Sequence, residues 1–302
     1  MKKTEFRDVH GILLLDKPQG LSSNQAMQRA RHLFRAKKAG HTGSLDPLAT
    51  GLLPICFGEA TKIAGYLLGS SKAYAAECRL GVTTTTDDSE GDVVETRAVP
   101  LLTAEAIDAA LQLLRGKITQ IPPIYSALKQ GGVALYKRAR RGEEVTVAPR
   151  EVEVFRFDLI EHTGDILKLH VECGSGTYVR SLVRDLGAAL GCGAHLTALR
   201  RLWVEPFRAP AMATIEQIDA LAHSQPTALD ALLLPLEQGL AALPGLNLSE
   251  DEVLRLTQGK LLSRPEQSDL QLCRALSPSG RLVALAEIHA GSVRVKRGFN
   301  TV

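Results

Sequence analysis

The chain has 302 residues, of which 45% are hydrophobic and 23% are charged, and its net charge is +3. This composition fits a soluble globular protein of about two domains, and the charge is too small to identify a partner. The first apolar run, residues 11–15, is far too short to span a bilayer, so we expect neither secretion nor membrane insertion. The five cysteines form no CxxC pair and no cluster with histidine, which indicates reduced thiols in the cytoplasm and no metal site.

Strand and helix patterns alternate through the first half of the chain. Residues 12–15 predict a buried strand that ends in a turn at residues 16–20, and a helix capped by Ser22 or Ser23 follows. The further elements expected here are an apolar run, a helix, an alternating strand and a second helix, over residues 52–57, 60–68, 74–80 and 103–115. Strands mixed with helices, without a regular βαβ repeat, predict an α+β fold.

Residues 121–150 interrupt this series of predicted strands and helices because they are rich in proline, glycine and basic residues. We interpret them as a protruding insertion. Residues 152–160 and 166–173 predict a hairpin, and a helix opens at Gly176. The pattern breaks at Pro244, so we expect a main domain over residues 1–243. A small β-rich module over residues 244–302 should dock on it, because so short a segment buries little core of its own.

One loop carries a candidate catalytic group. Residues 40–51 hold Asp46 among three glycines and a proline. These residues are incompatible with a packed helix, and the glycines permit close approach of the backbone to a ligand. An isolated Asp-Pro pair is more often an ordinary turn in which the carboxylate bonds nearby amides. The loop alone therefore leaves both interpretations open.

Basic residues gather in two places. Residues 1–38 hold nine Lys or Arg against three acids, and residues 137–141 form a second basic run beside Tyr136. Positive charge next to aromatic side chains suits an RNA backbone and its bases. A solvated helix face explains either run equally well.

Five segments, in order along the chain, together resemble the bacterial tRNA pseudouridine(55) synthase family. They read HGILLLDKPQG (10–20), GHTGSLDPLATGLLP (40–54), YSALK (125–129), GTYVR (176–180) and LRRL (199–202). The resemblance implies a pseudouridine synthase fold, which is a mixed, mainly antiparallel sheet flanked by helices. It also implies that residues 244–302 form a PUA-like RNA-binding domain. The basic residues of the insertion lead us to expect that residues 121–150 clasp the RNA.

The same resemblance implies an isomerase that detaches uracil from its ribose in the TΨC loop of tRNA, turns it and rejoins it through carbon, without a cofactor. Asp46 would be the key catalytic residue, as a nucleophile on the sugar or the base or as a base toward a sugar proton. Arg180 would keep Asp46 ionised and oriented, and Tyr74 would stack on the uracil and place its phenol near C5. Tyr178 and Leu199 would wall the pocket, and His41 would fill the space left by the flipped base.

The remaining candidate residues are basic side chains expected to contact the RNA backbone, namely Lys17, Lys129, Arg138, Arg140 and Arg141. The partner implied is a tRNA stem-loop, with no obligate protein partner. Two alternatives stay open, a non-catalytic RNA-binding or RNA-remodelling protein on the same fold and a nucleosidase that releases free uracil. An intact set of Asp46, Tyr74 and Arg180 favours the synthase, because a simple RNA binder has no use for a carboxylate that repels phosphate.

Overall fold

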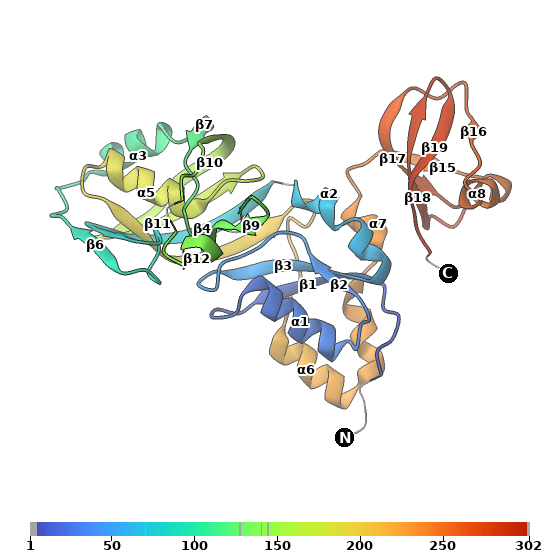
Figure 1. Cartoon of the computed structure of the whole chain (residues 1–302), viewed down its shortest axis with the longest axis horizontal. Helices are drawn as coiled ribbons and strands as arrows, with labels where there is room; N and C mark the ends of the chain where they lie inside the picture. The colour runs from blue at the N-terminus through green and yellow to red at the C-terminus, as the bar shows by residue number, and fades with distance from the viewer. Residues whose placement is uncertain (1–4, 70, 127, 140, 144, 301–302) are drawn as a thin grey trace.

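The computed structural model of the chain describes residues 5–69, 71–126, 128–139, 141–143 and 145–300. A ten-stranded sheet forms its centre (Figure 1). The eight strands of the main path are, in spatial order, β13 (Ala213–Thr214), β1 (Gly11–Lys17), β3 (Thr50–Phe57), β12 (Ala194–Val204), β4 (Lys72–Leu80), β11 (Ile166–Cys173), β10 (Arg150–Thr163) and β7 (Gly116–Gln120). Two short strands pair at its side, β14 (Leu233–Leu234) with β1 and β2 (Ala39–His41) with β3.

Most neighbours in this sheet are antiparallel, which confirms the predicted mixed, mainly antiparallel α+β architecture. The contact between β12 and β3 is parallel and only two residue pairs long, Arg200 with Thr50 and Arg201 with Gly51. Gly51 has φ +94°, and a Cβ there would lie 2.2 Å from the carbonyl oxygen of Arg201. Only glycine permits this approach, which joins the two halves of the sheet where the Asp46 loop ends.

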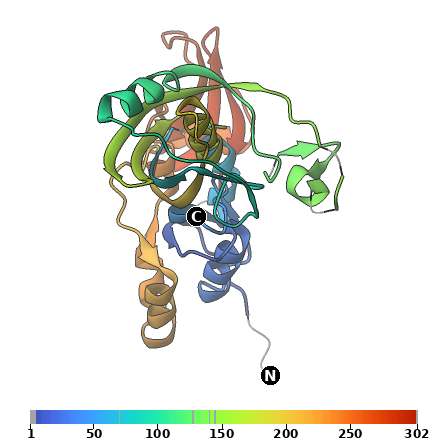
Figure 2. The ribbon, with the colours of Figure 1, turned by 90° about the vertical axis from the view of Figure 1, so that its left-hand side faces the viewer.

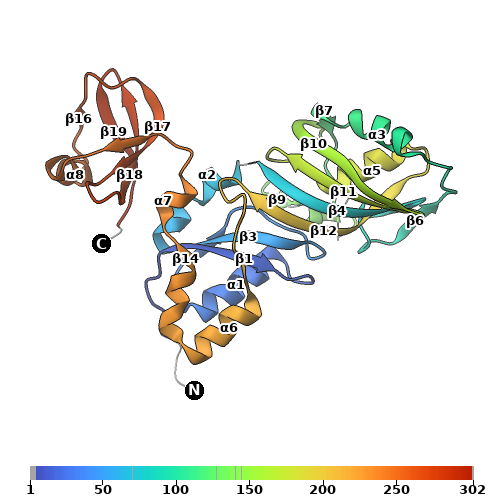
Figure 3. The same cartoon turned by 180° about the vertical axis from the view of Figure 1, so that it is seen from behind.

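Helices cover each half of the sheet separately. On the half formed by β1 and β3, α1 (Ser23–Leu33) lies beside α6 (Ile215–Ser224), and their apolar faces enclose a core that includes Phe34 and Phe57 (Figure 1). Ser22 caps α1 in a capping box with Gln25, as expected. On the other half, α3 (Ala104–Gln112) and α5 (Val179–Ala189) pack against β4, β10 and β11 (Figure 3).

A second sheet of five strands occupies the C-terminal part of the chain. Its order is β15 (Gly245–Asn247), β17 (Leu270–Leu276), β18 (Leu282–His289), β19 (Ser292–Gly298) and β16 (Leu262–Ser263), with α8 (Glu250–Thr257) beside it. Leu282, Leu285 and Phe299 share a buried cluster with Ile12 of the main sheet and with residues of α2 (Ala64–Leu68) and α7 (Leu236–Gly239). The module therefore docks on the main domain through apolar contacts.

Residues 121–150 contain a two-stranded hairpin of β8 (Lys129–Gln130) and β9 (Val133–Ala134), followed by α4 (Leu135–Ala139). Figure 2 shows this hairpin and helix projecting from the body of the main sheet. A further hairpin, β5 (Val82–Thr84) with β6 (Val93–Thr96), extends from the end of β4. Among the described residues, no helix combines the length and apolarity needed to cross a bilayer.

The single helix predicted over residues 60–68 is wrong, because the structure has a 3₁₀ turn at Gly58–Lys62 and then the short helix α2. Ile63 separates the two, and its amide bonds the carbonyl of Ala60 only three residues back, which breaks the α-helical register. The prediction also omitted α6, although Thr214 and Gln217 form a capping box at its start.

Candidate active site

The loop that carries Asp46 joins β2 to β3 and is held at both of its flanks. Leu45 and Leu48 are buried in the core, and the hydroxyl of Ser23 exchanges hydrogen bonds with the backbone of Leu45 at 2.7 and 3.0 Å. The amide of Gly20 donates to the carbonyl of Pro47 at 2.8 Å. The loop is therefore anchored by apolar side chains, whereas the Asp46 side chain keeps 42% of its surface exposed.

Arg180 is the cation that faces Asp46. It lies in the first turn of α5 and is almost fully buried, and its Nη2 is 3.0 Å from Oδ2 of Asp46. The same guanidinium donates to the carbonyls of Thr86 and Tyr125 at 2.9 and 2.8 Å, and its Nη1 lies 3.5 Å from Oδ2 of Asp88. These four partners hold the guanidinium in one orientation toward the carboxylate.

Burial of the carboxyl raises the pKa of Asp46 above its ordinary value. The charge of Arg180 opposes this shift, and the nearby Asp88 carboxylate adds to it. Asp88 is itself buried, and sequence reasoning did not single it out. The only signal available was a pair of acids, Asp87 and Asp88, in a polar threonine-rich stretch.

Asp46 and Arg180 line a cavity of about 330 Å³ together with Tyr74, Tyr178 and Leu199. Tyr74 comes from β4, Leu199 from β12, and Tyr178 is the residue that precedes α5. The guanidinium of Arg150 lies 5.0 Å from the centre of the Tyr178 ring. The structure thus brings the five candidate residues to one cavity, from segments far apart in the sequence.

Tyr74 is mostly enclosed, and its neighbours are polar as well as apolar. Burial raises the pKa of its phenol to about 12. The charge of the Arg201 guanidinium opposes this shift in the pKa of Tyr74 and favours the negative form of the phenol oxygen. The LRRL motif at residues 199–202 includes Arg201, but the sequence indicated no separate role for this residue.

His41 and Lys17 do not line this cavity. His41 ends β2, and burial together with the charge of Arg201 lowers its pKa, which favours the neutral imidazole. Lys17 is fully buried and donates to the carbonyl of Pro18 at 2.8 Å. Burial lowers the pKa of Lys17 to about 8, with Asp46 opposing the shift. A side chain so enclosed is not placed for the phosphate contact expected of it.

The basic residues of the insertion differ from one another. Arg138 pairs with Glu143 at 2.6 Å and bonds Gln130, whereas Arg141 is 66% exposed and lies 3.8 Å from Glu143. Arg140 and the side chain of Lys129 lie outside the described residues. Of the described pair, Arg141 is thus the more available for a phosphate.

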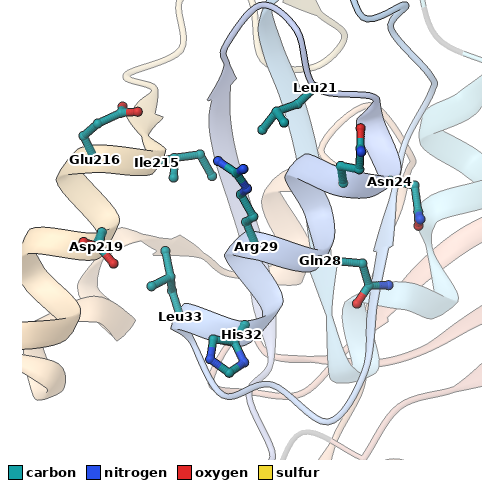
Figure 4. Close-up of a pocket in the computed structure, with 10 residues that line it drawn as sticks. Leu21, Asn24, Gln28, Arg29, His32, Leu33, Ile215, Glu216 and Asp219 are labelled. Atoms are coloured by element: carbon teal, nitrogen blue, oxygen red, sulfur yellow. The ribbon is translucent and has the colours of Figure 1, made fainter.

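A larger cavity of about 680 Å³ lies between α1 and α6 and contains none of these residues (Figure 4). Its lining mixes Arg29 and His32 of α1 with Glu216 and Asp219 of α6, over the apolar side chain of Ile215. No carboxylate is paired there with a buried cation among the described residues. The candidate active site is therefore distinguished by its chemistry and not by its size.

Comparisons with known proteins identify the family of the chain. Residues 31–179 match the family model of the TruB family pseudouridylate synthase N-terminal domain, and residues 180–241 match that of the tRNA pseudouridylate synthase B C-terminal domain. The chain is 59% identical to the tRNA pseudouridine synthase B of Xanthomonas campestris pv. campestris strain B100, over 98% of this chain and 96% of that protein. It is 58% identical to the tRNA pseudouridine synthase B of Xylella fastidiosa strain Temecula1, over 99% of each.

A solved structure of an H/ACA ribonucleoprotein bound to a substrate RNA containing 2′-deoxyuridine contains a chain with the same fold. The TM-score is 0.75 at 23% identity, over 96% of this chain and 85% of that one. The likeness to that chain concerns the fold alone, whereas the family models and the two bacterial relatives cover the Asp46 loop, the Arg180 helix and β12. The chain belongs to the TruB family of pseudouridylate synthases.

Proposed function

We propose that this protein isomerises uridine 55 in the TΨC loop of tRNA to pseudouridine, with Asp46 as the key catalytic residue. One observation carries the proposal, the ion pair of 3.0 Å between Arg180 and Asp46 at a cavity lined by two tyrosines and a leucine. A carboxylate held in this way suits chemistry at a base that has been lifted out of its stack. The names of the bacterial relatives support tRNA as the substrate.

The two carboxylate oxygens of Asp46 differ in their contacts. Arg180 contacts Oδ2, and among the described residues no hydrogen bond engages Oδ1. Oδ1 would therefore face the substrate, as a nucleophile toward the sugar or the base or as an acceptor of a sugar proton. All three roles need the ionised form, which Arg180 favours and burial opposes.

The other cavity residues would hold and orient the flipped base. Tyr74 and Tyr178 offer ring faces, and Leu199 offers an apolar wall, so a planar uracil would be fixed relative to Asp46. Extrusion of the base costs roughly a few kcal/mol. We propose that the neutral His41 ring offsets part of this cost by stacking in the vacated place.

Two further parts of the chain are proposed to bind RNA. The insertion at residues 121–150 would close on the stem-loop through its basic side chains, and residues 244–302 would act as a PUA-like RNA-binding domain after the catalytic domain of residues 1–243. A substrate of this kind places the protein in the cytoplasm, where the five cysteines, all buried and free of disulfides, would stay reduced.

The test is tritium release from tRNA transcripts labelled at uridine C5, because the C5 hydrogen must leave for the product bonded through C5 to regain its C5=C6 double bond. Wild-type protein should release one tritium per tRNA, and a transcript with cytidine at position 55 should release none above background. Free uracil in the products would identify a nucleosidase. Tight tRNA binding without tritium release would identify a non-catalytic RNA-binding protein.

A further inference from the structure

Arg201 is a buried cation whose role lies outside the mechanism described above. It lies on β12 with 1% of its surface exposed, among the largest fully buried side chains of the protein. Burial lowers its pKa, and the opposing influence comes from Tyr74 and not from a carboxylate. Among the described residues no carboxylate pairs with this guanidinium, and because a buried cation without an acid partner is costly, its presence calls for a reason.

The sheet register places Arg201 directly opposite Tyr74. The two residues are cross-strand neighbours on β12 and β4 and line the same cavity, so the guanidinium charge acts on the phenol. Two hydrogen bonds fix the guanidinium, from Nε to the carbonyl of Leu52 at 2.7 Å and from Nη2 to the carbonyl of Gly43 at 3.2 Å. Arg201 thus presents a fixed positive charge to the phenol and also ties the Asp46 loop to β3.

The charged and titratable groups that act on the Tyr74 phenol come from three segments. Arg201 of β12 favours the phenolate, whereas burial, Cys173 of β11 and Asp46 of the loop disfavour it. Lys72, two residues before Tyr74 on β4, lies close enough to Arg201 for the charge of Arg201 to lower its pKa. Arg201 is the one group among these named influences that stabilises negative charge on the phenol oxygen, and it lies opposite Tyr74 at the same cavity.

We propose that Arg201 is a positioning residue that stabilises negative charge on the Tyr74 oxygen while this oxygen removes the C5 proton of the rejoined base. This inference rests on the proposed function. In the rejoined base, C5 is tetrahedral and carries both the new bond to C1′ and its original hydrogen. The phenol proton of Tyr74 first passes to water, and the resulting phenolate oxygen takes that hydrogen as a proton. The C5–H electron pair forms the C5=C6 bond, the C6=N1 pair moves to N1, and N1 takes a proton from water.

The neighbouring arginine provides a matched control. Arg200 precedes Arg201 on β12 but forms an ion pair with Asp16 at 2.7 Å, with 40% of its side chain exposed. Arg200→Lys and Arg201→Lys therefore make the same chemical change on the same strand, and only the second alters the donor that faces Tyr74. Arg201→Gln keeps a donor without the charge and serves as a second variant if Arg201→Lys does not fold.

The experiment measures single-turnover rates on tRNA with hydrogen or deuterium at C5 of the target uridine. Arg201→Lys should lower the rate by about tenfold or more and reveal or enlarge a C5 isotope effect, because removal of the C5 proton becomes slow. Arg200→Lys should change neither quantity. Since Arg201 acts through Tyr74, adding Arg201→Lys to Tyr74→Phe should cause little further loss.

Three outcomes would overturn the inference, namely an unchanged rate in Arg201→Lys, a slower rate without any change in the isotope effect, and losses that multiply in the double variant. A purely structural role predicts the last two, because a displaced Asp46 loop slows every step alike. Failure of the proposed function is distinguishable, since wild-type protein would then make no pseudouridine from either substrate.

Discussion

Arg180→Met tests how far the buried guanidinium controls Asp46. At 3.0 Å and an effective dielectric constant of about 20, the two charges attract by about 5 kcal/mol. The Asp46 side chain is 42% exposed, so water screens the pair and a net value of about 2 kcal/mol is more realistic. That energy shifts the balance between carboxylate and carboxylic acid by a factor of about 30 toward the acid.

The expected result is a kcat that falls far more than tRNA affinity, and that falls most at low pH. Because burial already raises the pKa of Asp46, loss of the opposing cation raises it further, and the acidic limb of the rate profile moves to higher pH. The buried Asp88 also loses its cation, which adds to the repulsion. Single-turnover rates across a pH series, with binding measured at each pH, provide the comparison.

Arg184→Met is the control, because Arg184 lies one turn further along α5 and pairs with Asp87 at 3.1 Å. Its rate profile should keep the wild-type shape. If Arg180→Met instead lowers affinity and rate equally, with an unmoved acidic limb, then Arg180 contacts phosphate and the reasoning above is wrong.

Three other variants probe separate parts of the molecule. Asp46→Asn should abolish tritium release and leave tRNA affinity within about tenfold, because the amide is neither nucleophile nor base; turnover near wild type would exclude the carboxylate mechanism. The raised pKa of folded Asp46 means that its stabilising contribution is complete at low pH and lost as pH rises through that pKa, so Asp46→Asn should resist urea better than wild type at neutral pH but not in acid. Equal urea midpoints at neutral pH would contradict this. Leu285→Ala removes a fully buried side chain between the two sheets and should cost about 2 to 5 kcal/mol of unfolding free energy, and an unchanged midpoint would argue against the docked module. Replacing four basic residues of the insertion by Gln should weaken binding to all tRNAs and flatten the slope of log K against log salt by up to about three or four units. The replaced residues are Lys137, Arg138, Arg140 and Arg141. Parallel lines for the two proteins would mean that these side chains form only a solvated face.

Local sequence rules predicted the features that depend on a few neighbouring residues. The glycines around Asp46 permit positive φ and the proline restricts φ, and the loop is where the sequence pattern places it. The cap at Ser22, one of the two serines expected there, was likewise predictable, because a capping box is complete within four residues. The helix over residues 60–68 was predicted wrongly, since Ile63 fits the apolar pattern equally well in a 3₁₀ turn.

Lys17 shows why the role of a charged residue cannot be inferred from its sequence neighbours alone. Its position in a basic segment suggested a phosphate contact, but it is the last residue of β1 and its side chain lies in the interior. Successive side chains of a strand point to opposite faces, and what covers each face is decided by elements elsewhere in the chain. Asp88 and Arg201 were overlooked for the same reason, because nothing beside them in sequence marks them as partners of Arg180 and Tyr74.

By itself the sequence determined the fold class, the family and the position of the candidate catalytic loop, because turn residues, periodicity and motif order are properties of neighbouring residues. The tertiary structure alone decided which charges meet. The parallel junction at Gly51 brings β12 beside β3, and the β12 register then sets Arg201 against Tyr74. Arg180, in the first turn of α5, lies beside Asp46 although the two residues are far apart in the sequence. Electrostatic interactions depend on distance in space and on burial, and neither quantity exists until the sheet has formed.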